Sequence, residues 1–211
     1  MSTYKCVIFD CDGVLVDSET IGNQVFVDMA NELGADINLD YAMKHFKGSF
    51  LKECIKHISK LIDLEIPQTF EQEYRKRSFD AFKANIKPIQ GILEVLQNIK
   101  LPFCVASSGP ESKIKLNLEL TGLLPFFKNN IFSSYAIQKW KPDPGVFLLA
   151  AETMGYKPSE CIIIEDSLSG VKAAINGGFD VFGYTAHDLD NELEVLATKT
   201  FGSMNDLLEM I

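Results

Sequence analysis

Two aspartates separated by one residue follow the first apolar run of the chain. Asp10 and Asp12 come directly after the run from Cys6 to Phe9. Three later apolar runs also end in polar residues: Ser107 and Ser108 after 103–106, Lys141 shortly after 130–132, and Glu165 with Asp166 after 161–164. Carboxylates, an ammonium and hydroxyls are complementary in charge, which is typical of a site that binds a cation and an anion together.

Four carboxylates in one crevice need a cation, because they cannot all stay ionised in a low dielectric. Several carboxylate oxygens suit Mg²⁺, which keeps part of its water shell and often bridges to a phosphate. A phosphate dianion would then lie between that metal, the Lys141 ammonium, the Ser107 hydroxyl and the backbone N–H groups of Ser108 and Gly109. The residue types therefore predict phosphoryl chemistry.

Two other ligand classes fit the motifs poorly. A calcium-binding EF-hand loop starting at Asp10 would need Gly at its sixth position and Glu at its twelfth, where the chain has Leu15 and Ile21. No Walker A or G-x-G-x-x-G motif occurs, so nucleotide binding has none of its usual sequence support.

The elements that must position these residues alternate between short apolar strands and helices. Strands are predicted at five places: 5–9, 103–106, 130–132, 161–164 and 180–183. Nearly unbroken apolar strands separated by helices indicate an α/β fold, a Rossmann-like parallel sheet with helices on both faces. In such sheets ligands bind outside the carboxyl ends of the strands, so the polar residues above are expected to converge.

A long segment without strand signal interrupts this alternation. Residues 18–85 are too many for a loop and are predicted to form an inserted α-helical cap, leaving 1–17 and 86–211 as the catalytic α/β core domain. Helical spacing places seven apolar residues on one face of a cap helix: Phe50, Leu51, Cys54, Ile55, Ile58, Leu61 and Ile62. The opposite face carries Lys52, Lys56 and Lys60, which we interpret as solvated.

Composition narrows the partners and the compartment. The 211 residues carry a net charge of -9, which argues against nucleic acid or an anionic membrane as a partner, and no protein partner is evident. Asp10 interrupts the first apolar run too early for a signal peptide, and no run is long enough to span a membrane. Five scattered cysteines without C-x-x-C spacing favour free thiols and a cytoplasmic location.

The order of these motifs resembles the haloacid dehalogenase superfamily. The stretch from Phe9 to Asp17 is similar to the first family motif, and the other three follow in family order at Ser107, at Lys141 and at Glu165-Asp166. The resemblance implies a magnesium-dependent enzyme with Asp10 as nucleophile and Asp12 as general acid and base. It also implies roles for the remaining positions: Ser107 and Lys141 in catalysis, and Asp10, the Asp12 carbonyl, Glu165 and Asp166 at the metal.

Within the superfamily, the helical insertion resembles the cap of the β-phosphoglucomutase-like subgroup. Dehalogenases lack a carboxylate at the position of Asp12, so the resemblance implies a phosphatase. The mutases carry a cap His and an Arg where this chain has Gly22 and Leu51, which favours hydrolysis over a phosphosugar mutase.

The substrate implied by the resemblance is a small phosphorylated metabolite, a sugar or sugar-acid phosphate. The stretch from Ile137 to Pro144 and the segment from Phe46 to Gly48 are similar to the bacterial 6-phosphogluconate phosphatase group. Lys47 is a candidate contact for a substrate carboxylate or phosphate, and a solvated surface lysine is the alternative interpretation. A non-catalytic phosphate-binding protein is the remaining alternative, but it would be expected to lack at least one of Asp10, Asp12, Lys141 or Asp166.

Overall fold

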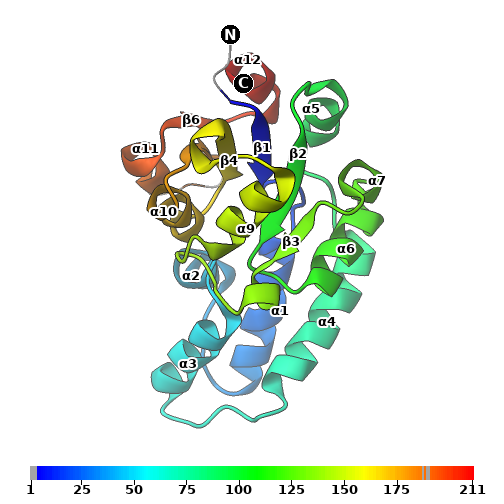
Figure 1. Cartoon of the computed structure of the whole chain (residues 1–211). Helices are drawn as coiled ribbons and strands as arrows, with labels where there is room; N and C mark the ends of the chain where they lie inside the picture. The colour runs from blue at the N-terminus through cyan, green and yellow to red at the C-terminus, as the bar shows by residue number, and fades with distance from the viewer. Residues whose placement is uncertain (1–3, 187, 189–190) are drawn as a thin grey trace. The chain divides into compact units, whose positions relative to one another are not determined.

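A computed structural model of the chain describes residues 4–186, 188 and 191–211, and its central element is a parallel β-sheet (Figure 1). The strand order is β3-β2-β1-β4-β5-β6. The strands span β1 Cys6–Phe9, β2 Phe103–Ser107, β3 Ile131–Ser133, β4 Cys161–Glu165, β5 Asp180–Tyr184 and β6 Lys199–Phe201. The predicted α/β fold with a parallel sheet is confirmed, and each of the five predicted strands lies within one residue of its observed bounds.

Strand β6 was not predicted. It is a three-residue strand that pairs with β5 at the edge of the sheet. Its residues are Lys199, Thr200 and Phe201, of which only Phe201 is buried. A strand so short and so polar gives no apolar run that a sequence pattern would detect.

Helices cover both faces of the sheet, as predicted. On one face, Ile8 and Ala106 belong to a buried apolar cluster with residues of α9 and α10. On the other face, the Phe103 ring contacts the Phe127 ring of α7 at 5.5 Å between centroids. The helices of this part of the chain are α5 Ile92–Asn98, α6 Glu111–Leu120, α7 Leu124–Phe127, α8 Ser134–Ile137, α9 Gly145–Met154, α10 Leu168–Asn176, α11 Glu192–Leu196 and α12 Leu207–Met210, with 3₁₀ turns at Pro158–Glu160 and Met204–Asp206.

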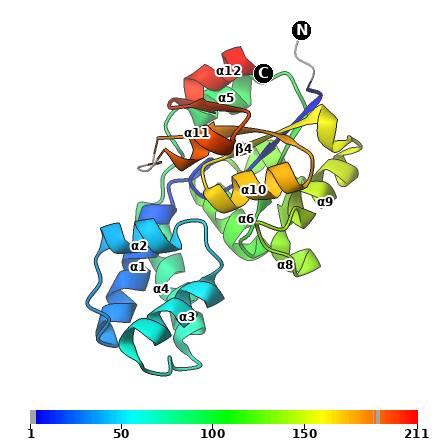
Figure 2. The same cartoon turned by 90° about the vertical axis from the view of Figure 1, so that its left-hand side faces the viewer.

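The chain divides into two compact units. The core unit comprises residues 1–16 and 87–211 and contains the sheet, and the helical unit comprises residues 17–86. The helices of the helical unit are α1 Glu19–Glu32, α2 Leu39–Phe46, α3 Leu51–Ile62 and α4 Phe70–Asn85 (Figure 2). This division lies one residue from each predicted domain boundary, and the catalytic and cap roles of the two units remain predictions.

The helical unit has its own apolar core around Phe26. Its ring contacts those of Phe46, Phe70 and Tyr74 at centroid distances of 5.1, 5.7 and 5.7 Å. Five residues of the predicted apolar face pack into this core: Leu51, Cys54, Ile55, Ile58 and Ile62. Phe50 is half-buried just before α3 and does not belong to the core, and Leu61 is 48% exposed. Leu61 instead lines a surface cavity beside α3, because it lies at the border of the apolar stripe.

All five cysteines are buried free thiols, and Cys54 is the one that belongs to the helical unit. Burial raises the pKa of the Cys54 thiol to about 12. Among the described residues, no helix combines the length and apolar character needed to cross a membrane.

Candidate active site

The register of the sheet brings the predicted site residues to one edge. Strand β1 pairs with β2 on one side and with β4 on the other, in parallel. Asp10 directly follows β1, Ser107 is the last residue of β2 and Glu165 is the last residue of β4. The three side chains therefore leave the sheet at neighbouring carboxyl ends, which is where ligands bind in open α/β sheets.

Three buried carboxylates form an acidic cluster at this edge. Asp10, Glu165 and Asp166 each offer one oxygen, and these oxygens lie within 4.8 Å of one another. Gly13 makes room for the cluster, since a Cβ atom at this residue would lie 2.2 Å from Asp166 Oδ2. Gly13 also has a φ of +82°, a left-handed conformation that favours glycine.

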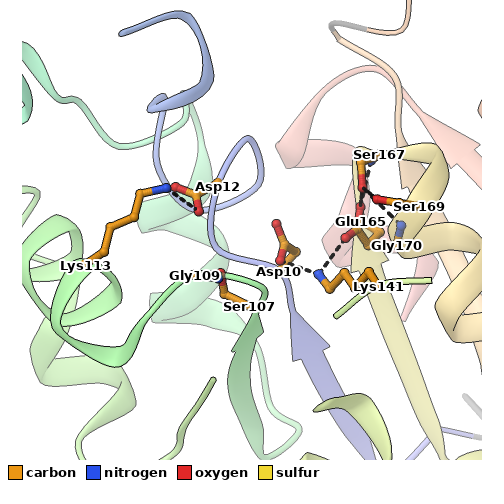
Figure 3. Close-up of polar contacts among 10 residues, drawn as sticks. All are labelled: Asp10, Asp12, Ser107, Gly109, Lys113, Lys141, Glu165, Ser167, Ser169 and Gly170. Carbon is orange, nitrogen blue, oxygen red and sulfur yellow. Dashed lines mark hydrogen bonds and ion pairs between the residues drawn. The ribbon is translucent and has the colours of Figure 1, made fainter. Parts of the chain in front are cut away.

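The Lys141 ammonium binds two members of this acidic cluster (Figure 3). Its Nζ atom lies 2.5 Å from Asp10 Oδ1 and 2.7 Å from Glu165 Oε1. The same atom lies 4.6 Å from the centre of the Phe147 ring, and the Lys141 side chain is only 3% exposed. A buried ammonium with two charged partners and an aromatic face has little freedom to move.

Burial and neighbouring charges act on the protonation of this pair. Burial raises the pKa of the Asp10 carboxyl well above its usual value, Lys141 opposes the rise, and the nearby carboxylates add to it. For Lys141, burial lowers the pKa, but the charges of Asp10 and Glu165 outweigh burial and raise it above its ordinary value. Lys141 thus carries a positive charge in direct contact with two carboxylates of the acidic cluster.

Glu165 is held from its other side by the start of α10. Its Oε2 atom accepts hydrogen bonds from the Ser167 N–H at 2.7 Å and from the Ser167 hydroxyl at 2.9 Å. Ser167 also caps α10, because its Oγ accepts from the Gly170 N–H at 3.1 Å. A Cβ atom on Gly170 would lie 1.8 Å from Glu165 Oε1, so this carboxylate needs a glycine beneath it.

The acidic cluster fits a divalent cation by its donors and its charge. Three buried carboxylates with all-oxygen donors suit Mg²⁺, and one lysine does not neutralise three negative charges. Both carboxylate oxygens of Glu165 accept hydrogen bonds, Oε1 from Lys141 and Oε2 from Ser167, whereas Lys141 contacts only the Oδ1 atom of Asp10. The donor set therefore favours Asp10 and Asp166 as direct ligands, with Glu165 in support.

The Asp12 side chain lies apart from the acidic cluster and pairs with Lys113. Lys113 Nζ, in the first turn of α6, lies 2.9 Å from Asp12 Oδ2. Sequence analysis did not single out Lys113. One signal was present: a lysine in the first turn of a helix faces the positive end of the helix dipole and is disfavoured there unless an acidic partner is near.

The loop after β2 differs in one respect from the expectation. The Ser107 hydroxyl oxygen accepts a hydrogen bond from the Gly109 N–H at 3.0 Å, so this N–H is already used within the loop. The Gly109 carbonyl accepts from the Ser133 hydroxyl at 2.6 Å, which fixes the loop to the end of β3. Ser133 is a second supporting residue that the sequence patterns did not reveal. Ser108 is half-buried in the same loop.

Lys47 belongs to the helical unit, where it follows the last residue of α2 and is half-buried. Its predicted contact with substrate remains a prediction.

The helical unit also contains a surface cavity of about 480 Å³, lined by His45, Ser49, Glu53, Cys54, Lys56, His57, Lys60 and Leu61. Lys56 and Lys60 are exposed, which agrees with the interpretation of these lysines as solvated. Both also line this cavity.

Comparison with known proteins agrees with this site. The sequence profile described as "Haloacid dehalogenase-like hydrolase" matches residues 7–184. The chain belongs to this family of hydrolases. It is 34% identical to the 6-phosphogluconate phosphatase of Escherichia coli K12, over 100% of this chain and 96% of that protein.

A more distant relative supports the same class of enzyme, and a solved structure supports the fold. The chain is 25% identical to the phosphorylated carbohydrates phosphatase of Thermotoga maritima, over 89% of this chain and 88% of the relative. A solved structure of a putative β-phosphoglucomutase from Thermotoga maritima shares the fold with a TM-score of 0.76, at 24% identity over 98% of this chain and 100% of the other. The names of the Escherichia coli and Thermotoga maritima relatives by sequence both support a phosphatase.

Proposed function

We propose that this protein is a magnesium-dependent phosphatase that hydrolyses a small phosphorylated sugar or sugar acid through an aspartyl-phosphate on Asp10. The observation that carries the proposal is the buried arrangement of Asp10, Lys141 and Asp166 at the carboxyl edge of the sheet. It combines a nucleophile, a cation for the transferring phosphoryl group and ligands for a metal.

Asp10 acts as the nucleophile in this proposal. One of its oxygens attacks phosphorus, the bond from phosphorus to the ester oxygen breaks, and Asp12 gives a proton to that leaving oxygen. Asp12 then takes a proton from the water that hydrolyses the aspartyl-phosphate. Asp10 and Asp166 would hold Mg²⁺, which would supply positive charge to neutralise the phosphoryl oxygens.

The buried cation and the hydroxyl complete the phosphate site. Lys141 holds positive charge beside Asp10, so it stabilises the negative oxygens of the phosphoryl group. The Ser107 oxygen accepts from Gly109, and its own proton has no acceptor among the described residues, so it is available to a phosphate oxygen. Glu165 acts indirectly by holding Lys141.

The substrate class rests on the relatives. The E. coli relative is named for 6-phosphogluconate, which makes this sugar-acid phosphate the first candidate substrate here, with Lys47 as a candidate contact for its carboxylate. The free thiols of all five cysteines suit a cytoplasmic location.

A phosphosugar mutase is the alternative activity, and the absence of a His at one position of the helical unit disfavours it. The mutases of the subgroup carry a cap His where this chain has Gly22. A Cβ atom on Gly22 would already lie 3.3 Å from the Tyr74 hydroxyl, which leaves little room for a larger side chain.

A phosphate-release screen tests the proposed function. Purified protein is given sugar phosphates, sugar-acid phosphates and nucleotides, with Mg²⁺ or with excess EDTA. We expect the highest kcat/KM on a sugar or sugar-acid phosphate and loss of turnover in EDTA, because the carboxylates repel a dianion when no metal is bound. Turnover that persists in EDTA, or isomerised sugar phosphate as the main product, would contradict the proposal.

A further inference from the structure

The Lys113–Asp12 ion pair lies at the border of the site. The two residues are 101 positions apart in the sequence, and their charged atoms are 2.9 Å apart. The Lys113 side chain is 23% exposed and that of Asp12 is 13% exposed. Both side chains are accessible to water, in contrast to Lys141 and its partners.

The path of the Lys113 side chain is defined by Gly109. A Cβ atom on Gly109 would lie 3.5 Å from Lys113 Cδ, 3.4 Å from Ser107 Oγ and 3.8 Å from Asp12 Oδ2. The stem of Lys113 therefore passes close to the Gly109 backbone, between the phosphate-binding loop and Asp12. The Ser133 hydroxyl donates to the Gly109 carbonyl at 2.6 Å, which holds the backbone beneath this stem.

Figure 3 shows the direction of the Asp12 carboxylate in this ion pair. The Asp12 carboxylate points toward Lys113, while Asp10 points toward Lys141 on the opposite side. A cation held by Asp10, Glu165 and Asp166 would attract any further carboxylate within reach, and Asp12 is only two residues from Asp10. Lys113 offers Asp12 a competing positive charge away from that cluster.

We propose that Lys113 is a positioning residue that holds the Asp12 carboxylate on the leaving-group side of the site. The inference rests on the proposed function, in which Asp12 moves the protons. Lys113 is not needed for the attack by Asp10. It keeps Asp12 within reach of the ester oxygen and later of the attacking water.

The test separates proton transfer from the other steps by choice of leaving group. An aryl phosphate leaves as a stable phenolate and needs little help from an acid, whereas a sugar phosphate needs a proton on its leaving oxygen. Rapid-quench experiments measure phosphorylation of Asp10 by each ester, and its later hydrolysis, for wild type, Lys113→Met and Lys113→Arg. Lys115→Met is the matched control, because Lys115 lies on the same helix and pairs with Glu111 at the surface.

For Lys113→Met, we expect phosphorylation by the sugar phosphate to slow by about 10- to 100-fold, the range for a misplaced catalytic group. Phosphorylation by the aryl phosphate should change by less than about 3-fold, because it needs little acid catalysis. Hydrolysis of the aspartyl-phosphate should slow as well. Lys113→Arg should recover most of the loss, and Lys115→Met should match wild type. A crystal structure of Lys113→Met should show the Asp12 carboxylate turned from its wild-type direction.

Equal losses on both esters, or an unchanged Asp12 direction in the variant structure, would overturn the role of Lys113. A wild-type protein that neither ester phosphorylates would refute the proposed function itself, so the two failures are distinct.

Discussion

Asp10 and Asp12 are separated by a single residue, but their carboxylates have different surroundings. Asp10 is buried against Lys141 and belongs to the acidic cluster, so its charge is balanced inside the protein. Asp12 is partly exposed and pairs with Lys113, whose side chain is 23% exposed. A nucleophile and metal ligand benefits from a rigid, dry setting, and a proton carrier needs access to a leaving group and water. The two surroundings thus match two roles.

Asparagine substitutions at the two positions test this comparison most directly. Asp10→Asn removes the nucleophilic oxygen and one ligand charge, so turnover should fall by at least about 10⁴-fold, as is typical when a nucleophile is removed. Asp12→Asn should lower sugar-phosphate turnover by about 10²- to 10⁴-fold, the usual range for acid–base catalysis.

Mass spectrometry after a short pulse with an aryl phosphate distinguishes the roles. Asp12→Asn should retain a phosphate adduct, because Asp10 can still attack and no base remains to activate water. Asp10→Asn should show none. The reverse pattern would mean that the two roles are exchanged.

Gly170→Ala tests whether the buried Glu165 carboxylate needs the space that a glycine leaves at this position. Within a helix this change ordinarily stabilises by about 0.5–1 kcal/mol. Here the new methyl group would overlap Glu165, so we expect a net destabilisation on the order of 1–3 kcal/mol and a roughly 10- to 100-fold loss of kcat/KM. Lys172→Ala, at an exposed position of α10, is the matched control for helix propensity. Denaturant unfolding and steady-state kinetics measure both quantities, and a fully active, stabilised Gly170→Ala protein would show that Glu165 has room to move.

The smallest expected effect is a pH dependence of stabilisation by Mg²⁺. Burial raises the pKa of the Asp10 carboxyl in the folded protein above its unfolded value, near 3.8. Without metal, the stabilisation of the folded state that this shift provides is complete below the unfolded pKa and is lost as pH rises through the higher folded pKa. A bound cation favours the ionised carboxylate, so Mg²⁺ should raise the melting temperature more at pH 8 than at pH 5.5, by a few degrees. Asp10→Asn should lose most of this difference. If Mg²⁺ raised the melting temperature of the wild-type protein equally at both pH values, this prediction would be wrong.

Much of the fold could be read from the sequence because each predicted strand contains a short apolar stretch that is mostly buried. The convergence of Asp10 with Glu165 followed from parallel pairing alone, since it needs only that strand ends meet at one edge. Strand β6 escaped because its residues lack an apolar run. Leu61 lies at the border of its helical stripe, where spacing alone does not decide burial.

The supporting residues of the site could not be predicted in the same way. Lys113 forms an ion pair with Asp12 across 101 residues of sequence, and Ser133 at the end of another strand donates a hydrogen bond to the Gly109 carbonyl. Such pairs depend on side-chain directions at the end of a sheet, which no local pattern encodes. Glycines 13 and 170 likewise reveal their role only when the carboxylates above them are placed.

The buried state of all five cysteines has a practical consequence for studying the two units. Thiol-reactive dyes attack the thiolate, and burial raises the pKa of Cys54 to about 12, which leaves little of this form at neutral pH. The native chain should therefore label poorly, and one cysteine introduced on the surface of each unit would accept a donor and an acceptor dye without removing any native thiol. Single-molecule energy transfer between the dyes would then follow the separation of the units as substrate is added.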